Sequence, residues 1–215
     1  MFKNLEILLY TLQLSENLGN IPVVFKLYDA VSEGIKRTDV EKETELFISQ
    51  NPGILEMYES KNPIWVEEQY DIEALSTYKE NSLAKAYASH MLKSGFKPDF
   101  YPHDKNQDIF SFLENRNRKT HDIWHVVTGL GVDVYGEVAL QAFYQSQSPS
   151  PEIGFVIISQ ILGAINSGDS TKMDSIFAAI SEGYTLGKTY KPLFGIKWEE
   201  LWNEDLETLR VSLKN

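Results

Sequence analysis

The chain carries a compact group of metal-ligating residue types in the stretch THDIWHVVTGLGVDVYGE, residues 120–137. His121 is followed directly by Asp122, His125 comes four residues after His121, and Glu137 lies twelve residues past His125. Two imidazoles and two carboxylates suit a borderline or hard divalent ion such as Zn²⁺, Mn²⁺, Fe²⁺ or Mg²⁺. The i, i+4 spacing of the histidines is also typical of a hydrogen-bonded pair on a helix surface. The stretch therefore indicates either a metal centre or such a pair.

A helix would bring the first three of these side chains together. With about 100° of rotation per residue, His125 lies about 40° from His121 and about 60° from Asp122 on the helical wheel. The three side chains then occupy one face of the helix. They can reach a single point.

Two glycines and an aspartate predict a tight turn before Glu137. Gly129 and Gly131 interrupt the first helix, and Asp133 is a suitable N-cap for a second helix. Glu137 then falls one turn into the second helix, at a height similar to that of His125. We expect an αα-hairpin that carries the site, with Gly136 allowing its two helices to approach closely.

Arg118 lies on the same predicted helix face as the histidines. It precedes His121 by three residues and Asp122 by four, so its guanidinium is expected one turn toward the N-terminus. An anionic head group bound at a metal would meet this positive charge. The alternative is an ion pair of Arg118 with Asp122 or Glu114 and no contact with a ligand.

The rest of the chain has the periodicity of helices joined by short loops. Residues 82–95 repeat apolar side chains at helical spacing and end at Gly95, a suitable C-terminal cap. Ser150 and Pro151 are an N-cap and a first helical residue for an apolar helix that the stretch NSGDS, residues 166–170, would end.

Helical spacing also predicts the end of the chain. The stretch WEELWNEDLETLRVSLK is expected to form a last helix, with an apolar face made by Trp202, Leu206, Leu209 and Leu213. Strand-like alternation is scarce. Proline and glycine mark loops at NPG (51–53), KNP (61–63) and KPDFYPHD (97–104). We therefore expect an all-α, single-domain helical bundle over residues 1–215.

Composition narrows the classes of partner and of site. The net charge of −11 opposes binding to nucleic acid, and the absence of cysteine excludes disulfides, thiolate metal ligands and a cysteine nucleophile. The first residues, MFKNLEILLYTLQL, lack the features of a signal or transit peptide, which predicts a cytoplasmic protein. The most apolar stretch, residues 152–165, is shorter than the roughly 20 residues of a membrane span and is expected to be a buried helix.

The spacing of the motif, HD, two residues, H, eleven residues and E, resembles the signature of a ubiquinone (coenzyme Q) biosynthesis family, the fourth of the Coq proteins. The stretches NSLAKAYASHMLKSGFKPD, NRNRKTHDIWHVVTGL, GEVALQAF and EGYTLGKTYKPLFGIKWEELWNEDLETLRVSL are also similar to that family. The resemblance covers roughly residues 75–215 and is loose before them. Gly131 stands where the family is expected to have proline, which affects the turn and leaves the ligands unchanged.

This resemblance implies a helical protein, usually dimeric, that binds a divalent metal such as zinc through His121, Asp122, His125 and Glu137. It also implies an apolar cavity for an isoprenoid tail. The activity implied is replacement of the carboxyl group at ring carbon one of a prenylated hydroxybenzoate-type precursor by oxygen, with other quinone-biosynthesis proteins as partners at the inner face of a membrane. Candidate cavity residues are Trp124, Phe143, Phe155, Ile158 and Leu162.

Two other functions fit parts of the pattern. The first is a non-catalytic scaffold or carrier that uses the same metal and lipid cavity. The second is a His-Asp phosphohydrolase, which would take its ligands from His90 or His103, His121 with Asp122, and Asp169 or Asp174. Outside that reading, His90 is expected to be a packing residue and His103 an exposed loop residue. The chain has no nucleotide or flavin signature.

Overall fold

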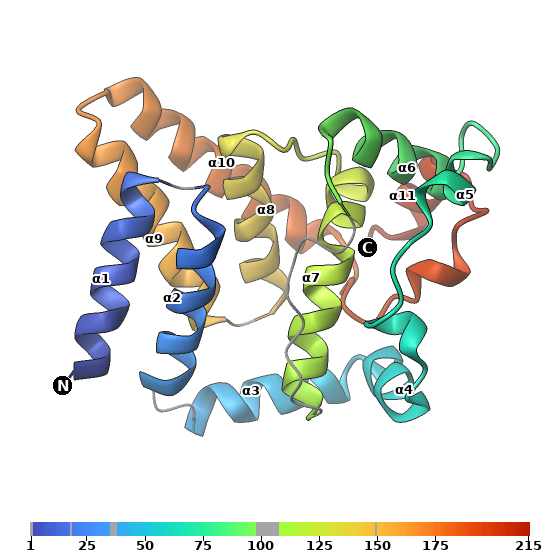
Figure 1. Cartoon of the computed structure of the whole chain (residues 1–215), viewed down its shortest axis with the longest axis horizontal. Coiled ribbons are helices and arrows are strands. Elements are labelled where there is room, and N and C mark those ends of the chain that lie inside the picture. Colours follow the sequence, from blue (N-terminus) through green and yellow to red (C-terminus); the bar gives the residue numbers. More distant parts are fainter. Residues whose placement is uncertain (1, 18, 35–37, 98–107, 149) are drawn as a thin grey trace. The chain divides into compact units, whose positions relative to one another are not determined.

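The computed structural model describes residues 2–17, 19–34, 38–97, 108–148 and 150–215. Within these ranges the regular structure is helical and no β-strand forms, which confirms the all-α class. The helices (Figure 1) are α1 (Phe2–Glu16), α2 (Ile21–Gly34), α3 (Thr38–Ser49), α4 (Pro52–Ser60), η1 (Pro63–Trp65), α5 (Ile72–Ser76), α6 (Leu83–Ser94), α7 (Ile109–Thr128), α8 (Val134–Gln147), α9 (Pro151–Asn166), α10 (Ser170–Thr189), η2 (Trp198–Glu200) and α11 (Leu206–Ser212).

The contacts divide the chain into two compact units. The first unit comprises Met1–Phe47 and Leu130–Thr189, and the second comprises Ile48–Gly129 and Tyr190–Asn215. Each unit therefore joins segments that are far apart in sequence. The expectation of a single domain over residues 1–215 stays a prediction.

In the first unit, α1 packs against α2 and α9, while α8 packs against α9 and α10. Figure 1 shows α1, α2 and α9 side by side. These three helices share an apolar core, which is built from Ile7 and Leu14 of α1, Leu27 and Val31 of α2, and Val156 of α9.

Glycines bring α10 close to α8. A Cβ atom at Gly183 would overlap the backbone carbonyl of Ala139, and one at Gly187 would overlap the hydroxyl of Ser146. The helix backbones can therefore approach at a distance that larger residues would not allow. This packing supports α8, the helix that carries Glu137.

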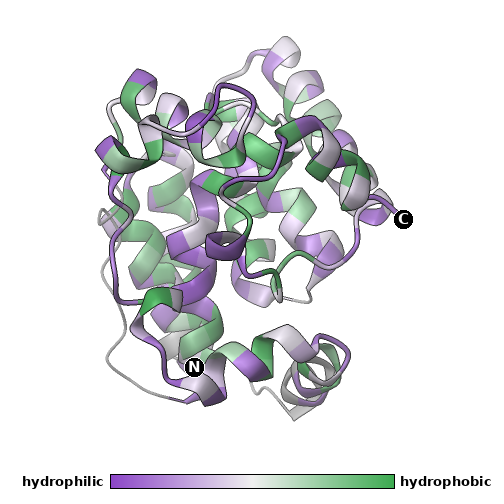
Figure 2. Cartoon of the chain, turned by 90° about the vertical axis from the view of Figure 1, so that its right-hand side faces the viewer, coloured by the Kyte–Doolittle hydropathy of each residue, from purple (hydrophilic) through white to green (hydrophobic). Residues whose placement is uncertain are grey.

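In the second unit, α6 packs against α5 and α7, and its bounds confirm the prediction from the sequence. The hydroxyl of Ser82 accepts a hydrogen bond from the N–H of Lys85 at 3.1 Å, and Gly95 ends the helix at φ 69°. Figure 2 shows hydrophobic and hydrophilic residues alternating along the helices, as expected for amphipathic packing. The predicted apolar stripe of α6 is buried and consists of Leu83, Ala84, Tyr87, Ala88 and Met91.

The expected continuous C-terminal helix is wrong. The segment begins with the short η2 helix, and α11 starts only at Leu206 because the carboxylate of Asp205 caps it by accepting from the N–H of Thr208 at 2.9 Å. Between the two helices, the carbonyl of Trp202 accepts a hydrogen bond from the N–H of Ala84 at 3.1 Å. Pairing with the start of α6 therefore takes the place of a helical turn around Trp202.

Two further expectations need correction. The NPG stretch does not form a loop, since Pro52 is the first residue of α4, where a missing N–H costs nothing. The helix α9 begins at the predicted Ser150 cap, but it is not wholly buried, because Ile158 is 45% exposed and Ile165 is 49% exposed. Of the predicted loop at 97–104, only Lys97 is among the described residues.

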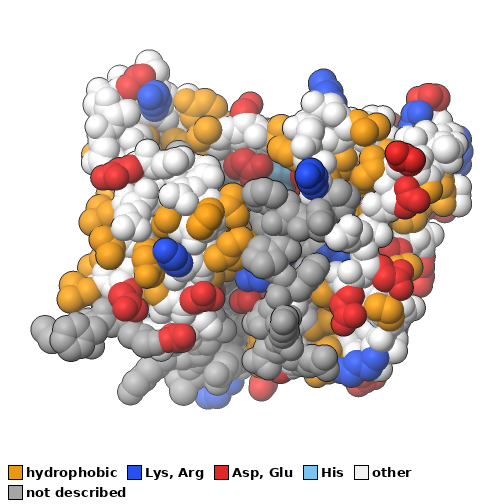
Figure 3. Space-filling view, viewed as in Figure 1, with side chains coloured by type: hydrophobic (Ala, Val, Ile, Leu, Met, Phe, Trp, Pro, Cys, Tyr) orange, Lys and Arg blue, Asp and Glu red, His pale blue; other side chains and the backbone are white. Residues whose placement is uncertain are grey.

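Helix α1 has apolar side chains on two faces. Ile7 and Leu14 are buried, whereas a second set of leucines is exposed, and Figure 3 shows hydrophobic side chains over this part of the surface. The exposed set consists of Leu5, Leu8, Leu9 and Leu12. Among the described helices, none combines the length and the apolar composition that a membrane crossing requires.

Candidate metal centre

The two motif histidines lie near the end of α7, and specific contacts fix both ends of this helix. The carboxylate of Asp108 begins it by accepting a backbone N–H at 2.8 Å, and Gly129 ends it in the left-handed conformation at φ 79°. Arg210 donates to the carbonyls of Val126 and Val127 at 2.6 and 3.1 Å. The last carbonyls of a helix have no hydrogen-bond partner within the helix. Here Arg210 supplies one, which holds the last turn of α7 in place.

Glu137 lies in the first turn of α8, which starts where the sequence predicted. The carboxylate of Asp133 accepts hydrogen bonds from the N–H groups of Tyr135 and Gly136 at 3.0 and 2.9 Å. A Cβ atom at Gly136 would overlap the carbonyl of Gly131, so this glycine makes room for the turn before α8. Its expected role in the approach of the two helices stays a prediction.

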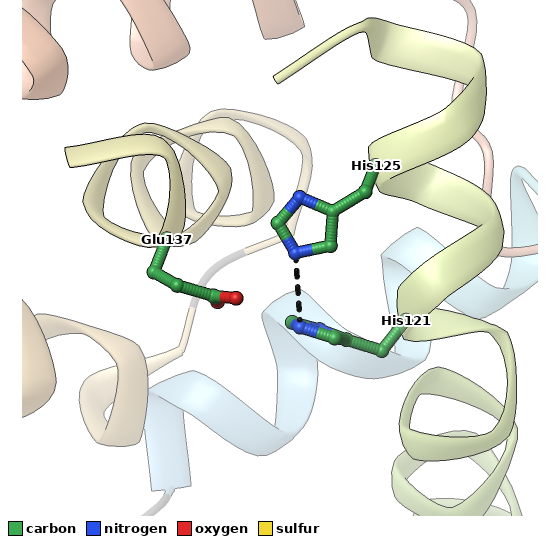
Figure 4. Close-up of side chains that lie close together, drawn as sticks. All are labelled: His121, His125 and Glu137. Atoms are coloured by element: carbon green, nitrogen blue, oxygen red, sulfur yellow. Dashed lines mark hydrogen bonds between the residues drawn. The ribbon is translucent and has the colours of Figure 1, made fainter. Parts of the chain in front are cut away.

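Three of the predicted ligands come together. Donor atoms of His121, His125 and Glu137 all lie within 4.8 Å of one another, and Figure 4 shows the carboxylate directed at the two rings. The two Nε2 atoms are 3.2 Å apart, with the ring planes at 82°. His125 is buried at 2% exposure, and the other two side chains are partly exposed.

The separation of the two imidazole nitrogens fits a shared metal ion. Two Zn–N bonds of about 2.05 Å at a tetrahedral angle place their nitrogens about 3.3 Å apart, close to the observed 3.2 Å. The same distance also fits a hydrogen bond between the rings. The Glu137 carboxylate is directed at the two rings (Figure 4). Its negative charge beside the two ring nitrogens favours a bound cation, which would neutralise it. A divalent ion held by these two nitrogens and one oxygen would keep coordination positions for a substrate.

Asp122 lies outside this three-residue cluster. Its Oδ1 atom is 3.4 Å from Nε2 of His90, a residue of α6. The role of Asp122 as a fourth ligand stays a prediction. His90 was expected to be a packing residue or a phosphohydrolase ligand. Its contact with Asp122 was not predicted, because the two residues are far apart in the sequence. His103 lies outside the described residues.

The phosphohydrolase alternative also required a distant aspartate. Asp169 accepts hydrogen bonds from the hydroxyl and the N–H of Thr171 at 2.7 and 2.9 Å, at the start of α10. These bonds lower the pKa of Asp169 and give its carboxylate a local structural role. Asp174 is exposed.

Arg118 forms the ion pair with Glu114 that was considered from the sequence. Its Nη2 atom lies 3.5 Å from Oε2 of Glu114, one turn earlier on α7. The contact is long and the side chain of Glu114 is 41% exposed, so the pair holds Arg118 only weakly. Glu114 therefore does not remove Arg118 from consideration as a partner for an anionic head group.

A buried ion network that the sequence did not indicate anchors α7. Arg116 is 1% exposed and donates to both carboxylate oxygens of Glu199 at 2.5 and 2.8 Å. It also donates to the carbonyls of Trp65 and Ile196 at 3.0 and 2.9 Å, and Tyr70 donates its hydroxyl to Glu199 at 2.5 Å. The network links α7 to segments on either side of it in sequence, within the second unit.

Lys119 borders the same network, and its pKa is lower than that of an ordinary lysine. Its ammonium lies 3.8 Å from Glu199 and donates to the carbonyl of Ile64. Burial lowers the pKa of Lys119 from 10.5 to about 8. Burial disfavours the charged form of a lysine, which accounts for this direction.

The lowered pKa predicts how stability changes with pH. Between about pH 8 and pH 10.5 the unfolded chain binds more protons at Lys119 than the folded chain does. The free energy of unfolding should therefore rise with pH there, by at most about 1.4 kcal/mol per pH unit from this group. Lys119→Met should remove that rise, as measured by urea unfolding across this range. The exposed Lys172→Met variant is the control, and an identical pH profile for Lys119→Met and wild type would contradict the assignment.

The candidate cavity residues differ in exposure. Trp124 and Phe143 are fully buried, and the ring of Trp124 contacts that of Phe194 at a centroid distance of 4.8 Å. Phe155 packs partly buried against the core of the first unit, and Leu162 is also partly buried. Ile158 is 45% exposed. Their role in lipid binding stays a prediction.

Known proteins resemble the chain over most of its length. The family model described as coenzyme Q (ubiquinone) biosynthesis protein Coq4 matches residues 53–214. The mitochondrial ubiquinone biosynthesis protein COQ4 of Kluyveromyces lactis is 27% identical over 185 residues, which cover 84% of this chain and 51% of that protein. The mitochondrial coq4 protein of Neosartorya fischeri is 29% identical over 141 residues, which cover 65% of this chain and 48% of that protein.

A solved structure resembles the chain along nearly its full length. The crystal structure of a protein from Nostoc punctiforme assigned to ubiquinone biosynthesis has a TM-score of 0.77 and 26% sequence identity. The similarity covers 98% of this chain and 97% of the Nostoc chain. It extends the likeness to the N-terminal residues, where the sequence resemblance is loose.

These relatives contradict the expected cytoplasmic location, because the curated ones are named as mitochondrial proteins. The expectation rested on the composition of the first residues, and this chain spans about half the length of the curated relatives it matches. The composition of these first residues therefore does not indicate where the protein is located. The match over residues 53–214 and the solved structure nevertheless agree with the motif, and the chain belongs to the Coq4 family of coenzyme Q (ubiquinone) biosynthesis proteins.

Proposed function

We propose that the chain is a metal-dependent protein of ubiquinone or prenylquinone biosynthesis that binds an isoprenoid-tailed aromatic precursor. Its proposed reaction is the oxidative decarboxylation of a prenylated hydroxybenzoate-type ring, in which oxygen replaces the carboxyl group at ring carbon one. The observation that carries this proposal is the convergence of His121, His125 and Glu137 at the family signature. The names of the relatives support the pathway.

The proposed ligands are the three clustered side chains, with Asp122 as a fourth. A divalent ion bound there would supply Lewis acidity to the head-group carboxylate or its neighbouring hydroxyl. Arg118, on the same helix, would add positive charge for an anionic head group. Loss of carbon dioxide and gain of a ring oxygen also consume an external oxidant such as dioxygen.

The lipid tail and the oligomer belong to the same proposal. An isoprenoid tail would need an apolar space between helices, and the buried Trp124 and Phe143 are each candidates to line such a space within their own unit. A homodimer is proposed as well, with the exposed leucine face of α1 as an apolar surface that a second copy could cover. Other quinone-biosynthesis proteins are the proposed further partners.

Turnover distinguishes the enzyme from a carrier. Metal-loaded protein would be incubated in air with a prenylated hydroxybenzoate whose carboxyl carbon is isotopically labelled. The expected result is release of labelled carbon dioxide together with a ring product that carries one more hydroxyl group. Binding of the precursor without either product would contradict the enzymatic proposal and favour the non-catalytic scaffold. Release of phosphate from nucleotides would favour the phosphohydrolase instead.

Arg118→Ala is expected to weaken binding of an anionic isoprenoid head group and to leave the metal content unchanged. A charge-assisted hydrogen bond is worth roughly 1.5–3 kcal/mol, so the loss should be about ten- to a hundredfold in affinity. Titration of an isoprenyl phosphate into metal-loaded protein measures it.

The matched control for Arg118→Ala is Glu114→Gln, which removes the Glu114 carboxylate from its pair with Arg118 while keeping the cation. Its affinity for the isoprenyl phosphate should equal or exceed that of the wild type. Equal affinities for wild type and Arg118→Ala would remove Arg118 from the site. A joint loss of metal and lipid would instead assign it to the support of a metal ligand.

A further inference from the structure

His90 lies beside the metal centre but outside its expected ligand set. It belongs to α6, whereas Asp122 and His125 belong to α7, and all three are in the second unit. Its Nε2 atom is 3.4 Å from Oδ1 of Asp122, and its ring lies over that of His125 with a centroid distance of 6.1 Å and an angle of 18°. One side chain thus contacts two residues of the motif.

The environment of His90 favours a directed polar contact over simple packing. Its side chain is 18% exposed and that of Asp122 is 15% exposed, so water screens the pair only partly. The Nε2 atom is shielded from solvent and forms no hydrogen bond with any described residue, because its 3.4 Å approach to Asp122 lacks hydrogen-bond geometry. A shielded ring nitrogen without a partner is costly. The carboxylate of Asp122, 3.4 Å away, could accept from it after a small rotation of either side chain.

We propose that His90 is a positioning residue for the metal centre, which holds the carboxylate of Asp122 through Nε2 and supports the ring of His125 by stacking. With its proton on Nε2 and a small rotation of either side chain, His90 would donate to Asp122 and fix the direction of that carboxylate. Carboxylates that bind metals in proteins are commonly held by such outer partners, whose loss costs about 10–100-fold in metal affinity. The inference rests on the metal centre of the proposed function.

The packing of α6 explains why His90 can act with precision. Tyr87 and Met91, three residues before and one residue after it, are buried at 1% exposure each. They fix α6 against its neighbours, and α6 packs directly against α7. His90 is therefore presented to Asp122 from a rigid helix, which is the arrangement that a positioning role requires.

Two substitutions at His90 distinguish the loss of its hydrogen-bond donor from the loss of its aromatic ring. His90→Phe keeps an aromatic ring over His125 and removes the donor, whereas His90→Gln keeps a donor. Zinc affinity, measured by competition with a chromogenic chelator, should fall about 10–100-fold in His90→Phe. It should recover to within about threefold of the wild type in His90→Gln, because the amide can donate to Asp122. Thermal unfolding of the metal-free proteins checks that both variants fold, and Ser89→Ala, at an exposed position of the same helix, is the control.

A double-mutant cycle tests whether His90 acts through Asp122. In an Asp122→Asn background, His90→Phe should cost less than about threefold in zinc affinity, because its partner is already lost. Wild-type zinc affinity in His90→Phe, or the same loss in both backgrounds, would overturn the inference. Absence of zinc binding by the wild-type protein would instead overturn the proposed metal centre, so the two failures can be told apart.

Discussion

Arg116→Met is expected to lower the free energy of unfolding by about 3–5 kcal/mol, because it leaves the buried carboxylate of Glu199 without its main partner. Arg116 donates to both oxygens of that carboxylate, and the side chain of Glu199 is 3% exposed. Removing one partner of a buried pair costs far more than the pair itself contributes. Urea unfolding followed by tryptophan fluorescence measures the loss.

The control for Arg116→Met is the double variant Arg116→Met with Glu199→Met. It replaces the ion pair by apolar groups of similar length, so most of the stability should return, although the hydroxyl of Tyr70 loses its acceptor. A single variant as stable as the wild type would contradict the burial and the pairing of Arg116. A double variant less stable than the single one would show that packing, and not charge, dominates.

The helix ends near the site could be predicted because their signals are local. Asp133 begins α8 and Gly129 ends α7 through contacts within a few residues, and the sequence contains both partners. The same reasoning located Ser150 before α9. It failed at Trp202, where hydrogen bonds to the distant start of α6 determine the backbone. Local pattern cannot anticipate such pairing.

The site was predictable to the extent that it lies on one hairpin. His121, His125 and Glu137 are close in sequence, and their spacing together with the family resemblance identified the cluster that the structure contains. The contact of His90 with Asp122 joins two helices separated by a long connection. The partners Arg116 and Glu199 are 83 residues apart. Packing of distant segments creates these contacts, and no spacing rule encodes them.

Replacing both motif histidines, His121→Ala with His125→Ala, is expected to abolish metal binding. Wild-type protein purified under metal-replete conditions should carry about one divalent ion per chain, and the variant should carry almost none, because only Glu137 of the three clustered donors remains. Metal should also stabilise the wild type, by about 2.7 kcal/mol at a hundred times the dissociation constant. Elemental analysis and thermal unfolding with and without metal measure both effects.

The acidic surface of the chain makes a matched control necessary for the histidine variant. With 31 Asp and Glu residues, the protein can attract divalent ions weakly at many points. Removing two exposed acids, Glu80→Ala with Glu207→Ala, should leave the metal content and the metal-induced stabilisation as in the wild type, since these side chains are 85% and 77% exposed. A histidine variant that keeps stoichiometric metal would place the ion elsewhere. It would also remove the basis of the proposed function, because the two rings would then be a hydrogen-bonded pair and not part of a metal site.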